Sequence, residues 1–166
     1  MGKRALGVSI REKADGTKVY IVRWEEYGGE ERQCKSREFP RPELEGTLEA
    51  FGQFIPYLCL IPASRINYTI IAGASIKYPK TGHPTLTLGV SLGLENGLDF
   101  DFESPAVPLH MEKYTLENAQ TWAEKCSAMA KLLCDEIIFY AEGKRAQQQL
   151  EFEQKEESEK EEGGDN

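Results

Sequence analysis

Residues 86–103 read LTLGVSLGLENGLDFDFE, and apolar side chains alternate with small or polar ones on both sides of Asn96-Gly97. Such alternation is typical of β-strands that bury one face. A two-residue turn would pair Leu92 with Asp101, whereas a three-residue loop ending in Gly97 pairs apolar residues throughout. The expected pairs are Leu94–Leu98, Leu92–Phe100 and Val90–Phe102. The stretch therefore predicts an antiparallel hairpin with Gly97 at positive φ.

A second hairpin is predicted by the same comparison near the N-terminus, where strand patterns at 4–12 and 18–26 flank Ala14-Asp15-Gly16. A three-residue loop keeps the apolar residues on one face, and a slip of one residue would turn them to the other face. The expected pairs are Ile10–Tyr20, Val8–Val22 and Leu6–Trp24.

The whole chain follows one order of elements. Further strand patterns lie at 30–37, 66–78, 84–94 and 98–103. A helix is expected to start near Pro42 and a second near Thr115, which is a candidate N-cap. Three strands and a helix thus occur twice. We predict an α+β fold: an antiparallel sheet with two helices on one face, from a duplicated βββα pattern.

Charge is unevenly distributed along the 166 residues. Residues 1–41 carry ten Lys and Arg against seven Asp and Glu, whereas residues 150–166 carry two against eight. We expect residues 1–146 to form a single α+β domain. Residues 147–166, the acidic tail, are expected to be disordered because they bury too little apolar surface to offset ordering.

Composition also indicates the compartment. The chain has no apolar run near the roughly 18 residues that span a bilayer. Its four cysteines show no CxxC and no zinc spacing, so free thiols, no metal and no cofactor are expected. We therefore expect no membrane association and a cytoplasmic protein.

Two groups of residues are candidates for catalysis. Asp99, Asp101 and Glu103 share one face of a strand and suit Mg²⁺, which prefers oxygen ligands. The simpler interpretation is that they form the solvent side of a strand whose other face is apolar. His83 and His110 have no catalytic partner at a recognisable spacing. The expectation is a protein that is not an enzyme.

A basic segment with an aromatic residue lies at 31–42, ERQCKSREFPRP. Its candidate nucleic-acid contacts are Arg32, Lys35, Arg37, Phe39 and Arg41. Basic side chains can contact phosphates while an aromatic ring stacks on a base. The alternative is a solvated edge strand, because Glu30, Glu31 and Glu38 dilute the charge.

Three stretches carry a resemblance: RPELEGTLEAFGQFIPYLCLIP, IKYPKTGHPTLTLGVSLGLENG and GKRAQQQLEFE. Together they resemble an uncharacterised family of small proteins encoded by tailed phages and prophages. The resemblance implies expression in a bacterial cytoplasm and brings no known activity.

The end of that family is similar to the peptide that bacterial sliding clamps bind. The resemblance implies Gln147 or Gln148 as the orienting residue and Leu150 and Phe152 as apolar anchors, although Glu151 separates the two anchors. The alternative is that Leu150 and Phe152 pack on their own domain.

Three functional hypotheses follow. The first is a non-enzymatic phage accessory protein that binds a host or phage protein, in DNA replication or recombination. The second is an inhibitor of a bacterial anti-phage defence that binds a defence protein or sequesters a small ligand. The third is a metal-dependent enzyme built on Asp99, Asp101 and Glu103. The sequence leaves open whether the chain forms a homo-oligomer.

Overall fold

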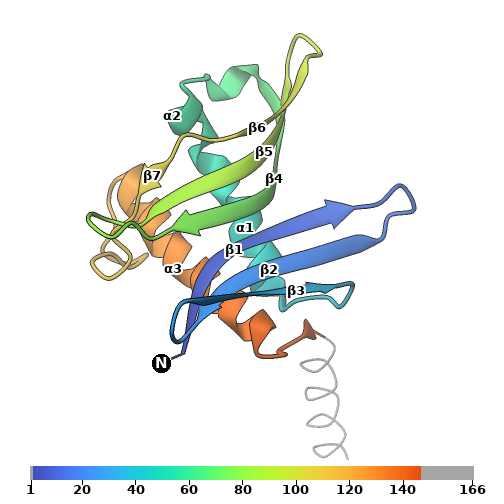
Figure 1. Cartoon of the computed structure of the whole chain (residues 1–166). Helices are drawn as coiled ribbons and strands as arrows, with labels where there is room; N and C mark the ends of the chain where they lie inside the picture. Colours follow the sequence, from blue (N-terminus) through green and yellow to red (C-terminus); the bar gives the residue numbers. More distant parts are fainter. Residues whose placement is uncertain (1, 147–166) are drawn as a thin grey trace, which may run out of the picture.

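A computed structural model describes residues 2–146, which contain one antiparallel sheet with the strand order β3-β2-β1-β4-β5-β6 (Figure 1). A short strand, β7, pairs with β5 beside this path. The strands are β1 (Lys3–Glu12), β2 (Lys18–Glu26), β3 (Glu30–Ser36), β4 (Ile66–Lys77), β5 (Thr85–Leu94), β6 (Asp99–Glu103) and β7 (Val107–Pro108).

The helices lie on one face of this sheet, behind it in the view of Figure 1. They are α1 (Pro42–Ala50), the 3₁₀ turn η1 (Phe51–Phe54), α2 (Ile55–Cys59), the 3₁₀ turn η2 (Ala63–Arg65) and α3 (Trp122–Ala141). The predicted α+β class, with an antiparallel sheet covered on one face by helices, is confirmed. Strands β1 to β3 precede α1 and strands β4 to β7 precede α3, but duplication of one ancestral unit remains an interpretation.

Both hairpins have the loops predicted from their alternation. Ile10 pairs with Tyr20, and Gly16 closes the first loop at φ 86°. In the second hairpin Leu92 pairs with Phe100, and Gly97 lies at φ 85°. Loops of three residues therefore keep the apolar side chains of each hairpin on the helix side.

Two local predictions are wrong. Trp24 pairs with Ala5, not with Leu6, because a bulge between Ala5 and Gly7 inserts one extra residue in β1. The second long helix begins at Trp122, and Thr121 is its N-cap. Thr115 instead closes a separate turn, where its side chain accepts a hydrogen bond from the Asn118 amide.

The core lies between the sheet and the helices. Its largest fully buried side chains come from strands β2 and β5, from the segment 44–55, from Leu109 and from α3. They are Tyr20, Tyr140, Phe51, Phe54, Leu44, Leu48, Ile55, Leu86, Leu88, Leu92, Leu109 and Leu133. Because side chains alternate along a strand, the opposite face of the sheet carries the remaining residues. None of the helices described for residues 2–146 lies over that face.

The sheet consists of two three-stranded meanders that meet along a short joint. Strands β1 and β4 pair only at Gly7–Ser75, Val8–Ala74 and Ser9–Gly73. A bulge precedes this contact in each strand, between Ala5 and Gly7 and between Ile71 and Gly73. Bulges bend strands and increase their twist. Beyond the joint the meanders diverge, as Figure 1 shows.

None of the helices described for residues 2–146 combines the length and the apolar composition needed to cross a bilayer.

Candidate binding site on the open face of the sheet

The joint between β1 and β4 forms the floor of a hollow on the face that no helix covers. The hollow measures about 620 Å³ and is lined by residues of β1 to β6. Ligand sites in proteins typically measure about 300–1,000 Å³. We call it the open-face hollow.

Glycines make the floor of the hollow. Gly73 of β4 and Gly89 of β5 line it and pair with each other, and Gly73 also pairs with Ser9 of β1. A Cβ on Gly73 would lie 2.8 Å from the carbonyl oxygen of Val8, which is closer than real Cβ atoms approach. The close approach of β1 and β4 therefore requires glycine at this position and leaves a surface without side chains above it.

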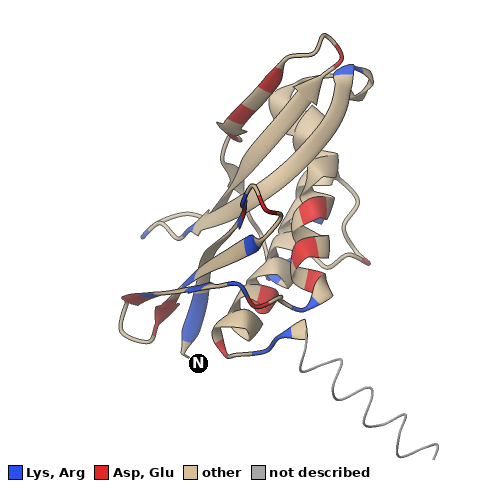
Figure 2. Ribbon diagram, turned by 90° about the vertical axis from the view of Figure 1, so that its right-hand side faces the viewer, with Lys and Arg blue, Asp and Glu red and all other residues tan. Residues whose placement is uncertain are grey.

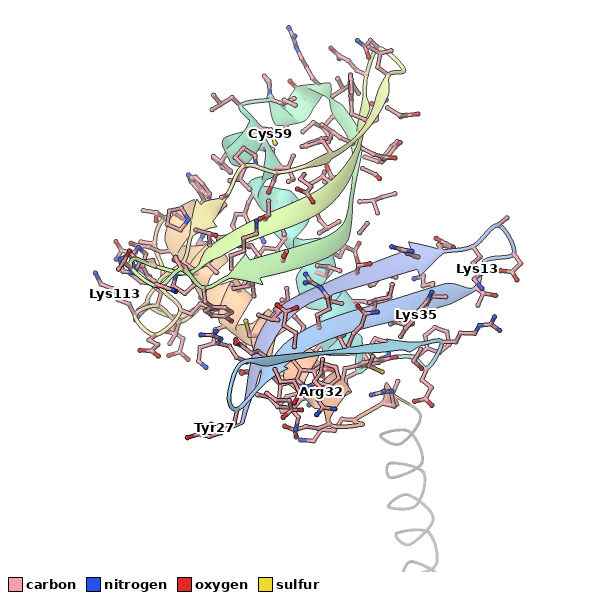
Figure 3. All side chains as sticks on the ribbon, viewed as in Figure 1. Lys13, Tyr27, Arg32, Lys35, Cys59 and Lys113 are labelled. Atoms are coloured by element: carbon pink, nitrogen blue, oxygen red, sulfur yellow. The ribbon has the colours of Figure 1, made fainter. Side chains whose placement is uncertain are left out.

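Four basic side chains surround this floor: Arg11, Arg23, Lys35 and Lys77. Lys35 stands beside Ile21 in the same cross-strand row as Ser9 and Gly73. Figure 3 labels Lys35 on β3 and shows the other labelled lysines, Lys13 and Lys113, away from the joint.

Arg23 reaches across the joint. Its guanidinium lies over Gly7, where an added Cβ would be 2.7 Å from Nη2. The same Nη2 donates a hydrogen bond of 3.3 Å to Ser75 Oγ on β4. The glycine on β1 thus lets an arginine of β2 lie flat across one strand and contact the next.

The four cations have no carboxylate partner within the described part of the chain. Seven other Lys and Arg residues form ion pairs within 4.0 Å among residues 2–146, whereas Arg11, Arg23, Lys35 and Lys77 form none. The hollow thus has four cations without an ion pair among residues 2–146 and one carboxylate, Glu103, in its lining. This excess of positive charge, with the hydroxyls of Ser9, Ser75 and Thr87 beside it, suits a ligand that carries more than one negative charge.

Carboxylates of strand β6 border the basic part of the open face on one side. Asp99, Asp101 and Glu103 face the same open side, and Figure 2 shows β6 as the acidic edge of the sheet. Asp99 accepts a hydrogen bond from the Tyr68 hydroxyl at 2.8 Å, and Asp101 accepts one from Ser91 at 2.6 Å. Among residues 2–146, no group of three His, Cys, Asp or Glu side chains is placed to hold a metal ion.

The basic segment singled out in the sequence does not form one surface. Lys35 lines the open-face hollow, but Arg32 pairs in register with the buried Trp24 and so lies on the helix side of β3. Arg41 lies 3.8 Å from Glu136 on the helix side, with its guanidinium 4.9 Å from the centre of the Phe139 ring.

The other two members of that segment follow β3. Arg37 is exposed just after the strand, and Phe39 is 64% exposed with its ring edge toward Tyr20. Of the five predicted nucleic-acid contacts, one therefore lines the hollow.

Sequence reasoning missed Arg11, Arg23 and Lys77. A signal was present: each occupies a strand position that alternates with core residues and therefore faces the open side. Their meeting depends on the pairing of β1 with β4, which no local pattern specifies.

The two histidines, for which the sequence indicates no catalytic partner, are in contact. The ring centroids of His83 and His110 are 4.0 Å apart, and Leu109 donates a backbone hydrogen bond to the Pro84 carbonyl nearby. The pair joins the β4–β5 loop to the connection before α3. It lies apart from the residues that line the open-face hollow.

The predicted partner-binding residues Gln147, Gln148, Leu150 and Phe152 lie outside the described residues. The chain just before them is anchored: the Ala146 amide donates to the Phe39 carbonyl at 3.1 Å. Arg145 donates to Glu38 at 2.8 Å, and its guanidinium lies 3.5 Å from the centre of the Tyr140 ring.

The four cysteines are free thiols, as predicted. Burial raises the pKa of the Cys126 thiol to about 12 and that of Cys134 to about 11. Both thiols therefore stay protonated near neutral pH and serve as packing residues of α3.

In comparisons with known proteins, no family model matches the chain, and no curated protein or solved structure matches it. The resemblance to a phage family stays a prediction, and the function is argued from the geometry of the site.

Proposed function

We propose that the protein is a non-enzymatic accessory protein that binds single-stranded nucleic acid in the open-face hollow. The observation that carries this proposal is the set of four cations, Arg11, Arg23, Lys35 and Lys77, which form no ion pair within residues 2–146 and surround a floor of glycine backbone. Phosphate groups supply the multiple negative charges that such a set attracts. This function agrees with the expectation of a phage or prophage protein that acts in DNA replication or recombination.

The shape of the site favours a single strand over a duplex. The cations lie on neighbouring strands of a curved sheet within one hollow of about 620 Å³. A groove that follows one backbone, with bases free to contact the surface beside it, is the arrangement used for single strands. A rigid duplex would bring one phosphate row to the rim and leave the floor empty.

The test is binding of the full chain to a fluorescent single-stranded oligonucleotide, followed by anisotropy at several salt concentrations. With four phosphate contacts we expect the logarithm of the binding constant to fall against the logarithm of salt with a slope of about −3. The double variant Lys35→Gln/Lys77→Gln should bind more weakly and reduce the slope to about −1.4.

The matched control is Lys125→Gln/Lys131→Gln, which removes two exposed charges from α3 on the opposite face. It should bind like the parent. The proposal would be overturned if both double variants lost the same affinity for the oligonucleotide, or if the parent bound no single strand at low salt. Binding of mononucleotides but not of oligonucleotides would assign the hollow to a small phosphorylated ligand instead.

The terminal peptide is a second, separate proposal. Because Arg145 and Ala146 are held against Glu38 and Phe39, the residues that follow start from a fixed point on the surface. That tether supports the proposal that Gln147 or Gln148, Leu150 and Phe152 dock on a protein partner of sliding-clamp type.

A further inference from the structure

A tyrosine lies flat on the open face beside the hollow. Tyr68 of β4 pairs with Gly93 of β5, and a Cβ on Gly93 would lie 2.1 Å from Tyr68 Cε1. The ring therefore covers the glycine backbone and crosses β5 to reach β6. There its hydroxyl donates to Asp99 Oδ1 at 2.8 Å.

Two contacts hold this ring in place while one of its faces remains accessible. The backbone of Gly93 supports the inner face, and Asp99 fixes the far end of the ring. Tyr68 is nevertheless 42% exposed. The hydrogen bond to Asp99 raises the pKa of the Tyr68 phenol, so the hydroxyl stays a donor at neutral pH. A fixed aromatic ring loses little conformational entropy when another ring stacks on it.

The ring continues the surface of the open-face hollow. Along the open side of β4 the order is Lys77, Ser75, Gly73, Ile70 and Tyr68. At about 3.3 Å per residue, Tyr68 lies ~15 Å from Gly73, within the span of a few nucleotides. Ile70, between them, is 56% exposed. The open side of β4 is therefore basic near Lys77 and becomes apolar and then aromatic toward Tyr68.

Carboxylates stand at the edge of the ring. Asp99 and Asp101 each bind one hydroxyl group through Oδ1, and a carboxylate has more acceptor sites than one hydroxyl fills. Both residues are exposed. Carboxylates accept hydrogen bonds from exocyclic amino groups such as N4 of cytosine, whereas thymine presents a carbonyl oxygen there.

We propose that Tyr68 is a stacking platform for one unpaired base of the strand whose phosphates occupy the open-face hollow, and that Asp101 selects a base with an exocyclic amino group. This inference rests on the proposed function and adds a base site and a preference to it. Comparing the affinities for cytosine and thymine tests this preference, because the two pyrimidines have rings of similar size and only cytosine carries an exocyclic amino group.

The experiment compares oligo(dC) and oligo(dT) of equal length by anisotropy with the full chain and its variants. The parent should bind oligo(dC) more tightly. Tyr68→Leu keeps an apolar side chain over Gly93 but offers no ring, and we expect its affinity to fall about 5- to 100-fold. Tyr68→Phe keeps the ring and should stay within about threefold of the parent. Asp101→Asn should narrow the difference between the two oligonucleotides.

A second readout separates stacking from fold stability. An oligonucleotide with one 2-aminopurine should lose fluorescence on binding the parent and Tyr68→Phe, but not on binding Tyr68→Leu. If Tyr68→Leu binds as tightly as the parent, or if the parent binds oligo(dC) and oligo(dT) equally well, the proposed base site at Tyr68 is wrong. Neither result would contradict phosphate binding in the open-face hollow. Absence of binding to both oligonucleotides by the parent would overturn the proposed function itself.

Discussion

Single glycines decide how closely the two meanders approach each other. At Gly73 an added Cβ would meet the Val8 carbonyl oxygen at 2.8 Å and the Ser9 Cα at 3.3 Å. Both obstacles belong to the backbone of β1, so neither can turn away as a flexible side chain would. Backbone atoms therefore limit the space at the joint. A substitution that needs more space there should lower the free energy of unfolding.

Gly73→Ala should lower the free energy of unfolding by about 1–3 kcal/mol, because the joint must open to admit the methyl group. The measurement is urea unfolding of the full chain. Gly46→Ala is the control, since Gly46 lies in α1 with nothing within 4 Å of its added Cβ. That variant should gain about 0.5–1 kcal/mol. Equal losses at both positions would contradict the close-approach argument.

Glu136 is a buried carboxylate on α3, with its side chain 9% exposed and 3.8 Å from Arg41. Burial raises its pKa above the ordinary value, although Arg41 opposes that change. The folded chain thus binds this proton more tightly than the unfolded chain, so stability falls as pH rises from the ordinary value through the raised one.

At pH 7, Glu136→Gln should therefore have its unfolding midpoint at a higher urea concentration than the parent. The difference between the two midpoints should become smaller as the pH falls toward 4. Unfolding curves across that pH range measure it. Glu117→Gln, which removes an exposed carboxylate, is the control and should unfold at the same urea concentration as the parent at pH 7. A Glu136→Gln variant that is less stable than the parent at pH 7 would mean that the contact with Arg41 outweighs the cost of burial.

At the scale of elements, helix α3 owes its starting point to a capping box. Thr121 Oγ1 accepts from the Glu124 amide at 3.2 Å, and Glu124 Oε1 accepts from the Thr121 amide at 3.3 Å. The pair satisfies two groups that a helix end leaves without partners. It also explains why the N-cap lies six residues after the first candidate, Thr115, which closes its own turn with Asn118.

Thr121→Ala should cost about 1 kcal/mol of stability and lower Tm by about 2–4 °C. Differential scanning calorimetry of the full chain gives both quantities. Thr115→Ala serves as the comparison and should cost less than about 0.5 kcal/mol, because its hydroxyl supports only an exposed turn. The reverse order of the two losses would show that Thr115 stabilises the helix after all.

At the scale of the whole molecule, the two proposed binding surfaces are separate. The open-face hollow lies on the uncovered side of the sheet, whereas Arg145 and Ala146 leave the domain beside Glu38, Phe39 and Tyr140. A strand in the hollow and a protein on the terminal peptide would therefore contact different residues. The two proposals can be tested independently.

The double variant Leu150→Ala/Phe152→Ala should lose binding to a purified bacterial sliding clamp, because both apolar anchors of the peptide are gone. Surface plasmon resonance with the full chain measures this loss, and the variant should keep its affinity for single strands. The docking role of the peptide is contradicted if the double variant still binds the clamp, or if the parent protein does not bind it.

Local chemistry made much of the fold predictable. Alternation with a period of two residues and a glycine at each loop predict both hairpins and their main registers, since these depend on neighbours in sequence. The bulge between Ala5 and Gly7 escaped this reasoning, because a bulge shifts register without changing composition. The start of α3 escaped it because Thr115 and Thr121 both satisfy the rule for an N-cap.

Patterns along the chain predict the strands, the existence of the long helices, the buried faces and the concentration of acidic residues at the end of the chain. The candidate site depends instead on contacts between distant segments. Arg11, Arg23, Lys35 and Lys77 come from four different strands, and they meet because β1 pairs with β4 across more than 60 residues of chain. That pairing follows from packing two meanders on a common set of helices, and packing of this kind joins residues that no local pattern relates.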